Sequence, residues 1–376
     1  MTKRDLLLTT INHEEGAVPS WTMAFFNIAL AERILGKDNV MTDYLPTKTY
    51  KAGRADDCNR ERCIRYSEAV DNCAVAMGRG GNFAFGHGGP GEMMEKIIER
   101  SEEYIISCFE TGVKKEVRFN PHFYKNFNHP LSTLEDAAKA FVPDALDEAR
   151  YTGIEGDAAF YKARGYLPYA NLNGIFSCIH YFYYPYEKLL MDMILDKENL
   201  ITLIKRISNF NLAAAEQLLR LGAEMITTCD DFGNGQNLLF SPALYQELFK
   251  PYHGELAALC HSYGAVLHLH SHGNILKILP DLVDAGVDMI NPFDPTEVGP
   301  LTDIKEAYGK KLTIVGGISK FFFEQDFGDM RECLRQIIAA GRKGGGFVLM
   351  DSGGIPENIT TEKYDFYREI SRELRE

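Results

Sequence analysis

The chain has 376 residues, of which 45% are hydrophobic and 25% are charged, and this composition is typical of a globular protein rather than of a disordered or fibrous chain. Its 53 Asp and Glu residues outnumber its 40 Lys and Arg residues. The resulting net charge of −13 would repel nucleic-acid phosphates and anionic lipid, so we expect no nucleic-acid partner and no membrane partner.

The cysteines and the apolar segments indicate the compartment. The eight cysteines are scattered singly, without a CxxC pair, as expected where thiols stay reduced. The N-terminal segment has only three consecutive leucines, which is too short for a signal peptide, and no apolar run is long enough to span a bilayer. We therefore predict a cytoplasmic protein.

Few elements can be predicted in the first 165 residues. Thr2 and Asp5 form a capping box for a short first helix, and residues 18–24 read as a strand. Residues 71–77 are expected to form a second strand, and residues 102–119 predict a β-hairpin with its turn near Gly112.

From about residue 165 onward, short apolar strands alternate with helix-length segments in six consecutive units. Leu200, Leu203, Ile204 and Ile207, for example, show the spacing of a helix with one buried face. Together with the two earlier strands, the six units predict a (β/α)8 barrel that forms a single domain over residues 1–376. The alternative is an open doubly wound sheet, but no GxGxxG pattern follows the first strand.

Histidines are concentrated at the end of one predicted strand. His268, His270 and His272 occupy alternate positions and should lie on one face of an extended segment. In a (β/α)8 barrel the active site lies at the carboxyl ends of the strands, where these residues occur. Neutral imidazole is a good ligand for zinc, iron and copper, so the pattern indicates either a metal site or hydrogen-bonded histidines inside the barrel.

Acidic residues end two other predicted strands, Asp230 and Asp231 in one and Asp351 in the last. One of these carboxylates could join two imidazoles in a three-ligand site. Adjacent acids point to opposite sides, so at most one of Asp230 and Asp231 should reach the centre, while the other caps a helix or orders its loop. We prefer Asp231, and we interpret the neighbouring Cys229 as a small buried side chain.

A run of aromatic residues follows the predicted strand that ends near residue 174. Most of these rings are expected to pack in the core, and one or two could line a pocket for an aromatic or flat apolar substrate. The run consists of Phe176, Tyr181, Phe182, Tyr183, Tyr184 and Tyr186.

Several segments along nearly the whole chain form a common pattern. They are TKRDLLLTTINHEEGAVPSW, PDALDEARY, DDFGNGQNLLFSPALYQELFKPY, HSHGNI, DLVDAGVDMINPFDP, TIVGGIS and GGGFVLMDSGGIPENIT. Together these segments resemble the uroporphyrinogen decarboxylase superfamily. The resemblance implies a single (β/α)8 barrel. The superfamily includes cofactor-free decarboxylases and zinc-dependent methyltransferases that act with a corrinoid protein.

The residues at the sites distinguish these two branches. The decarboxylases carry an arginine-rich segment after the first strand, where this chain has TMAFFNIALAER with Arg33 as its one basic residue. The methyltransferases have His-Ser-Cys-Gly where this chain has His270-Ser271-His272-Gly273, and a Gly-Cys pair where it has Gly353-Gly354. The resemblance therefore implies that His270 is a zinc ligand and that His272 replaces a cysteine ligand.

We predict a methyltransferase of the O-demethylase type, with His270, His272 and Asp231 holding Zn²⁺ and with Asp231 and His270 as catalytic residues. Two neutral histidines and one carboxylate would leave the ion with a net charge of about +1, which suits the polarisation of an ether or alcohol oxygen. The methyl group would pass from a small methylated substrate, such as a methoxyarene, to a corrinoid protein. The alternatives are a cofactor-free decarboxylase and a non-catalytic subunit that binds a corrinoid protein or a ligand.

Overall fold

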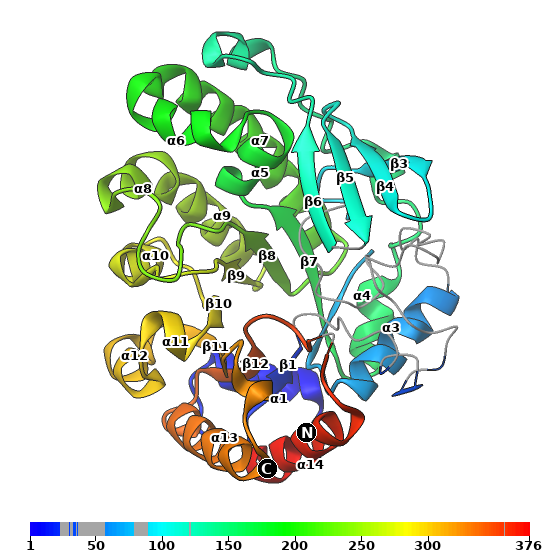
Figure 1. Cartoon of the computed structure of the whole chain (residues 1–376), viewed down its shortest axis with the longest axis vertical. Coiled ribbons are helices and arrows are strands. Elements are labelled where there is room, and N and C mark those ends of the chain that lie inside the picture. Colours follow the sequence, from blue (N-terminus) through cyan, green and yellow to red (C-terminus); the bar gives the residue numbers. More distant parts are fainter. Residues whose placement is uncertain are drawn as a thin grey trace.

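Eight parallel strands form a nearly closed barrel in the computed structural model of the chain (Figure 1). The structure describes residues 1–22, 57–78, 89–119, 122–356 and 358–376, together with the isolated positions 30, 33, 34 and 36. The strands are hydrogen-bonded in the order β1-β12-β11-β10-β9-β8-β7-β2. They comprise β1 (Ser20–Trp21), β2 (Ala74–Ala76), β7 (Leu167–Asn173), β8 (Met225–Cys229), β9 (Val266–His270), β10 (Met289–Phe293), β11 (Thr313–Ile318) and β12 (Phe347–Asp351). The predicted (β/α)8 fold is confirmed.

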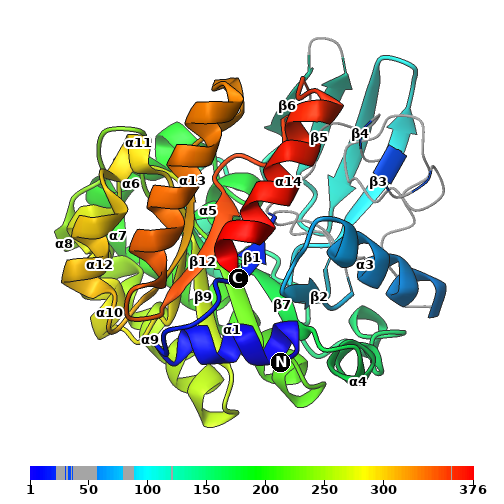
Figure 2. The ribbon, with the colours of Figure 1, turned by 90° about the horizontal axis from the view of Figure 1, so that it is seen from below.

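Helices connect the strands and surround them on the outside (Figure 2). The α-helices are α1 (Lys3–Ile11), α3 (Asp57–Ala69), α4 (Asp157–Ala163), α5 (Ile175–Phe182), α6 (Tyr186–Leu195), α7 (Lys197–Arg220), α8 (Pro242–Leu248), α9 (Lys250–Ser262), α10 (Leu279–Asp284), α11 (Pro295–Val298), α12 (Leu301–Tyr308), α13 (Phe327–Arg342) and α14 (Thr361–Arg375). Four 3₁₀ turns cover Leu134–Lys139, Glu148–Arg150, Leu276–Ile278 and Phe322–Glu324 within the described residues. No helix in these ranges combines the length and the apolar character needed to cross a membrane.

Local sequence signals explain several of these helices. The predicted capping box at the start of α1 is present, because Thr2 accepts from the backbone of Asp5 and Asp5 accepts from the backbone of Thr2. In α7 the predicted apolar stripe is buried over its whole length, and it holds the helix against the barrel wall.

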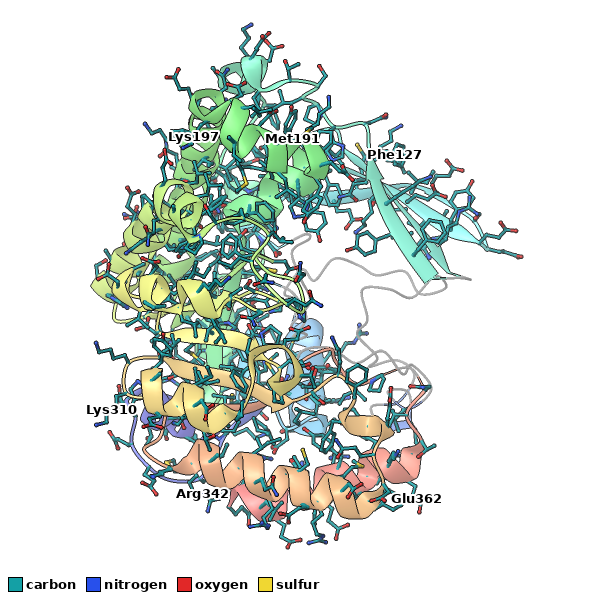
Figure 3. The ribbon with its side chains drawn as sticks, turned by 60° about the vertical axis from the view of Figure 1, so that its left-hand side comes forward. Phe127, Met191, Lys197, Lys310, Arg342 and Glu362 are labelled. Atoms are coloured by element: carbon teal, nitrogen blue, oxygen red, sulfur yellow. The ribbon has the colours of Figure 1, made fainter. Side chains whose placement is uncertain are left out.

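The predicted hairpin belongs to a larger structure. Strands β4 (Tyr104–Phe109) and β5 (Lys114–Phe119) are antiparallel, and Gly112 in their turn has a φ of +90°, a value that favours glycine. Strands β3 (Glu95–Arg100) and β6 (His122–Phe127) extend the hairpin to four strands, which we call the accessory sheet. Figure 3 shows it standing out from the barrel. Phe109 anchors the sheet by packing on Phe182 of α5, with ring centroids 4.8 Å apart.

Large side chains fill the inside of the barrel. Trp21 of β1 packs against Tyr169 of β7, with ring centroids 5.0 Å apart, and against His268 of β9 at 5.2 Å. Met289 and Met350 belong to the same buried cluster. The barrel is thus a packed core below its carboxyl-terminal mouth.

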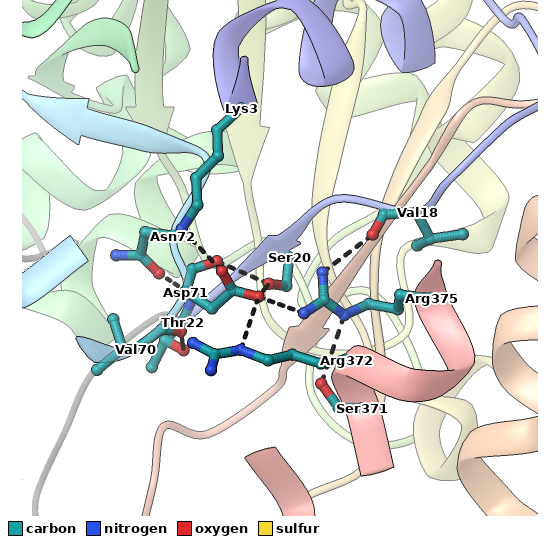
Figure 4. A network of polar contacts seen from close by, with 10 residues as sticks. All are labelled: Lys3, Val18, Ser20, Thr22, Val70, Asp71, Asn72, Ser371, Arg372 and Arg375. Atoms are coloured by element: carbon teal, nitrogen blue, oxygen red, sulfur yellow. Dashed lines mark hydrogen bonds and ion pairs between the residues drawn. The ribbon is translucent and has the colours of Figure 1, made fainter. Parts of the chain in front are cut away.

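A network of polar contacts joins the two ends of the strand order (Figure 4). The backbone N–H of Cys73, next to β2, donates to the carbonyl of Ser20 in β1 at 3.0 Å. Asp71 contacts Lys3 of α1 at 2.7 Å and also pairs with Arg375 of α14. The carboxylate therefore ties the first helix and the last helix to the point where the barrel closes.

Candidate active site

The strand register brings three polar residues to one level of the barrel. Cys229 of β8 lies opposite His270 of β9, and Asn291 of β10 lies opposite the same histidine. Met225 of β8 and Met289 of β10 face the barrel interior. Cys229 follows Met225, and Asn291 follows Met289, by an even number of residues along the same strand. Because side chains alternate along a strand, all three residues face the interior at its carboxyl-terminal end.

Asp231, two residues beyond the end of β8, completes a possible metal site. One ligand atom each from Cys229, Asp231 and His270 lie within 4.8 Å of one another, and this is the one such group of three or more among the described residues. The His270 Nε2 atom is 3.6 Å from the Asp231 carboxylate. Ligands of a tetrahedral Zn²⁺ lie about 3.3–3.8 Å apart, so small side-chain movements would fit these three atoms to the ion. We call this group the strand-end triad.

His270 is prepared to bind as a neutral imidazole. Burial, followed by the neighbouring His272 and His268, lowers the pKa of His270 well below its ordinary value. The Asn291 amide nitrogen donates to the Met350 sulfur at 3.4 Å, so its oxygen is left to accept from His270 Nδ1 at 3.2 Å. That bond places the proton on Nδ1 and leaves the Nε2 lone pair on the side of Asp231.

The two adjacent acids point in different directions. Asp230 is fully buried and accepts from the backbone N–H groups of Ile175 at 3.0 Å and Ser177 at 2.9 Å, in the first turn of α5. Asp231 accepts from the backbone N–H of His272 at 3.0 Å, and its side chain is 40% exposed. Asp230 therefore orders a helix, while Asp231 lies beside His270.

Glycine at position 174 makes the approach of Asp230 possible. A Cβ atom on Gly174 would lie 2.2 Å from the Asp230 carboxyl carbon and 2.3 Å from the carbonyl oxygen of Cys229. Any other residue would force β8 away from the start of α5. The close contact holds this strand end in place.

The remaining predicted site residues lie outside the triad. Asp351 is buried at the end of β12, near α14. Burial raises the pKa of Tyr367 in α14, and the negative charge of Asp351 raises it further. The His272 ring packs edge-on against His270, with centroids 4.7 Å apart. Its role as a metal ligand stays a prediction.

Sequence reasoning missed two residues of the site. Cys229 was expected to be buried, but it is partly exposed and belongs to the triad. Asn291 carried no signal, since its contact with His270 depends on the register of β9 against β10. The only sequence clue to Cys229 was its place at the same strand end as Asp231.

The predicted aromatic run divides into two sets. Phe176, Phe182, Tyr183 and Tyr184 are buried and belong to the main core, as expected for packing residues. The other two, Tyr181 and Tyr186, are partly exposed.

Comparisons with known proteins agree with this architecture. Residues 116–374 match the family described as uroporphyrinogen decarboxylase (URO-D). The solved structure of a methyltransferase from Methanosarcina mazei is similar over 100% of both chains, with a TM-score of 0.69 and 15% sequence identity. A protein from Listeria monocytogenes described as a vitamin-B12-independent methionine synthase has a TM-score of 0.45 and 14% identity, over 96% of this chain and 98% of its own. No curated protein matches the chain. At these identities the structural likeness concerns the fold.

Proposed function

The chain belongs to the uroporphyrinogen decarboxylase family, and from this premise we propose that it is a cytoplasmic methyltransferase of the O-demethylase type. It would move the methyl group of a small methylated substrate, such as a methoxyarene, to a corrinoid carried by a separate protein. The observation that carries the proposal is the strand-end triad of Cys229, Asp231 and His270 at the carboxyl-terminal mouth. The full-length likeness in fold to a methyltransferase supports it.

The donor atoms of the triad suit zinc. Thiolate, carboxylate and neutral imidazole are the three side-chain donors that Zn²⁺ binds in proteins. Cys229, Asp231 and His270 would hold the ion, and when bound it would act as a Lewis acid on the substrate oxygen. This ligand set neutralises the ion, whereas the set of His270, His272 and Asp231 leaves it with a charge of about +1. The identity of the third ligand therefore decides how strongly the site polarises oxygen.

The residues of this chain have a limited task in such a reaction. The cobalt(I) form of the corrinoid is a strong nucleophile, so the barrel need only hold the methyl carbon in line and stabilise charge on the departing oxygen. As the carbon–oxygen bond breaks, its electron pair stays on the oxygen, and cobalt(I) supplies the pair for the new bond. The hydrogen bond with Asn291 fixes the orientation of the His270 ring, and the backbone N–H of His272 fixes the Asp231 carboxylate.

The decarboxylase alternative has less support. Arg33, the one basic residue of the segment TMAFFNIALAER after β1, pairs with Asp365 of α14 at 2.9 Å, on the surface. A porphyrinogen substrate carries many carboxylates and needs several cations around it.

The direct test mixes the purified protein with a corrinoid protein in the cobalt(I) state and with methoxyarenes, methylamines or methanol in turn. We expect methyl-cobalt(III) formation, followed by absorbance, with at least one oxygen-bound methyl donor. His270→Ala should abolish it. His261→Ala, which changes an exposed histidine of α9 paired with Asp288, is the matched control and should retain it. No methylation with any donor, together with carbon dioxide release from uroporphyrinogen, would establish the decarboxylase instead.

A further inference from the structure

Strand β3 forms an open edge of the accessory sheet. It pairs with β4 on one side, and no strand of the described residues lies on its other side. Figure 1 shows β6 next to α5 and β3 on the side of the sheet that faces away from the barrel helices. Ile97 and Ile98 at the centre of β3 are 42% and 49% exposed. An open edge carries unpaired N–H and C=O groups, so it can pair with a strand of another molecule.

The backbone groups near both ends of β3 point toward this edge. The carbonyl of Met94, just before β3, accepts from the residue that follows β4 at 3.1 Å. The N–H of Ser101, just after β3, donates to the first residue of β4 at 2.9 Å. Both residues therefore turn their backbone groups toward β4. Because this direction alternates along an antiparallel strand, the backbone groups of Glu95 and Arg100 turn away from β4.

A β-bulge in β3 determines which of its side chains share a face of the sheet. The register against β4 shifts between Ile97 and Glu99, so β3 has one residue more than the segment opposite it. Plain alternation would put Lys96 and Glu99 on opposite faces. Their partners in β4 are Cys108 and Ile106, which are two residues apart, so the bulge brings Lys96 and Glu99 to the same face.

The same shift places Glu95 and Arg100 together on the other face. Their partners in β4 are Phe109 and Ile105, which are four residues apart. Glu95 also pairs with Lys115 of β5 at 2.9 Å on this face. Each face of β3 therefore carries one acidic and one basic residue at matching distances from the centre of the strand.

This order of charges makes β3 complementary to a second copy of itself. The strand has the sequence EKIIER. When two copies run antiparallel about a two-fold axis through the strand centre, Lys96 lies opposite the partner's Glu99. Glu95 then lies opposite the partner's Arg100, and the central isoleucines face one another. Cross-strand pairs of opposite charge and pairs of β-branched residues both stabilise a sheet.

Other arrangements bring like charges together. A shift by one residue places either Glu95 opposite the partner's Glu99 or Lys96 opposite the partner's Arg100, and parallel pairing places every charge opposite its own copy. Like charges directly opposite one another destabilise a strand pair. Charges and bulges often protect a sheet edge from association, but here the bulge brings complementary charges to a common face.

We propose that β3 is a dimerisation surface, which pairs antiparallel with β3 of a second copy of this chain and joins the two four-stranded accessory sheets into one continuous sheet. Glu95 is already bound to Lys115, so the two Lys96–Glu99 pairs carry most of the charge complementarity. Strand β3 has six residues, whereas a standard interface uses about 20–30 residues a side, so the dimer is weak, with a dissociation constant in the micromolar range.

Sedimentation of the full chain over a series of concentrations measures the dimer. We expect the wild type to pass from monomer to dimer in the micromolar range. Lys96→Glu places acids opposite one another, and Glu99→Lys places lysines opposite one another. Each should weaken the dimer by about ten- to a hundredfold, since two cross-strand pairs change from attraction to repulsion. Lys310→Glu is the matched control, because this exposed lysine lies away from the accessory sheet in Figure 3, and it should leave the affinity unchanged.

Mixing the two variants tests the register itself. In the mixture each introduced charge faces an opposite charge, so Lys96→Glu and Glu99→Lys should form a heterodimer with about the wild-type affinity. Misfolding of either variant cannot produce this recovery. The double variant, which exchanges the two charges within one chain, should dimerise like the wild type.

Three results would overturn the inference. The first is a wild type that stays monomeric up to roughly 1 mM. The second is a dimer whose affinity is the same in both single variants, since another surface would then join the copies. The third is a mixture of the variants that does not associate. Sedimentation does not involve methyl transfer, so the outcome is independent of the proposed function.

Discussion

Replacing Asp71 by Asn should destabilise the barrel by a predictable amount. The Arg375 side chain is only 9% exposed, and it would keep bonds to the Val18 carbonyl at 3.1 Å and to the Ser371 hydroxyl at 3.4 Å. Breaking a fully buried ion pair costs about 3–5 kcal/mol, whereas an exposed pair contributes about 0–1 kcal/mol. The Asp71 carboxyl is 23% exposed and its second partner, Lys3, is 33% exposed, so we expect a loss of about 2–3 kcal/mol.

The loss can be measured by calorimetry. An unfolding entropy of about 2.1 cal/mol/K per residue over this chain converts the loss into a Tm lowered by roughly 3 °C. Asp71→Ala should melt about 1 °C lower still, because Asp71 has a φ of +61° and Asn tolerates that conformation better than Ala. Asp136→Asn, which breaks an exposed pair with Lys139, is the control and should leave Tm unchanged.

The pH dependence gives a second check on the same network. Burial raises the pKa of Asp71, but the charges of Arg375 and Lys3 outweigh burial and hold it below its ordinary value. A carboxyl whose pKa is lowered by folding stabilises the protein above the pKa of the unfolded chain, about 3.9, and this stabilisation is lost as the pH falls through the folded-state value. The difference between wild type and Asp71→Asn should therefore shrink below about pH 4. Equal Tm values at pH 7 would refute the account of barrel closure given above.

Three other predictions test the site. Cys229→Ala and His270→Ala should each lower zinc affinity by orders of magnitude, measured by chelator competition with tag-free protein. A similar loss of affinity in His272→Ala, with no loss in Cys229→Ala, would refute the triad. Asn291→Ala should lower zinc affinity by about 10–100-fold without loss of the fold, since it orients a ligand; unchanged affinity would contradict that role. Asp230→Asn should lower the free energy of unfolding by about 1–2 kcal/mol in urea, because one of the two bonds to α5 is lost, and a stability equal to wild type would argue against it.

The sequence predicted the barrel well because its signals are local. Apolar stripes such as that of α7, and short apolar strands between helices, report burial directly. The outer strands of the accessory sheet lack such a signal. Strand β3 is exposed over nearly its whole length, and Ile97 and Ile98 at its centre are adjacent rather than alternating. Without a buried face there is no alternation from which to predict a strand.

The sequence predicts those features of the candidate site that follow from a single strand. It does not predict contacts between residues of neighbouring strands. The alternation of side chains along an extended segment is enough to separate Asp230 from Asp231. Cys229 and Asn291 reach His270 only through the register of three neighbouring strands. Register is set by packing across the whole barrel, and a single sequence does not contain it in readable form.

The two adjacent acids link the strand-end triad to the start of α5. Asp230 fixes the first turn of α5, and α5 carries Tyr181 at its other end. Asp231, the next residue, fixes the backbone of His272 and lies beside His270. A shift of the end of β8 would therefore move Asp231 of the strand-end triad and the start of α5 together. This explains why the barrel tolerates a buried carboxylate at Asp230, whose pKa is raised by burial, in a position that takes no direct part in the proposed reaction.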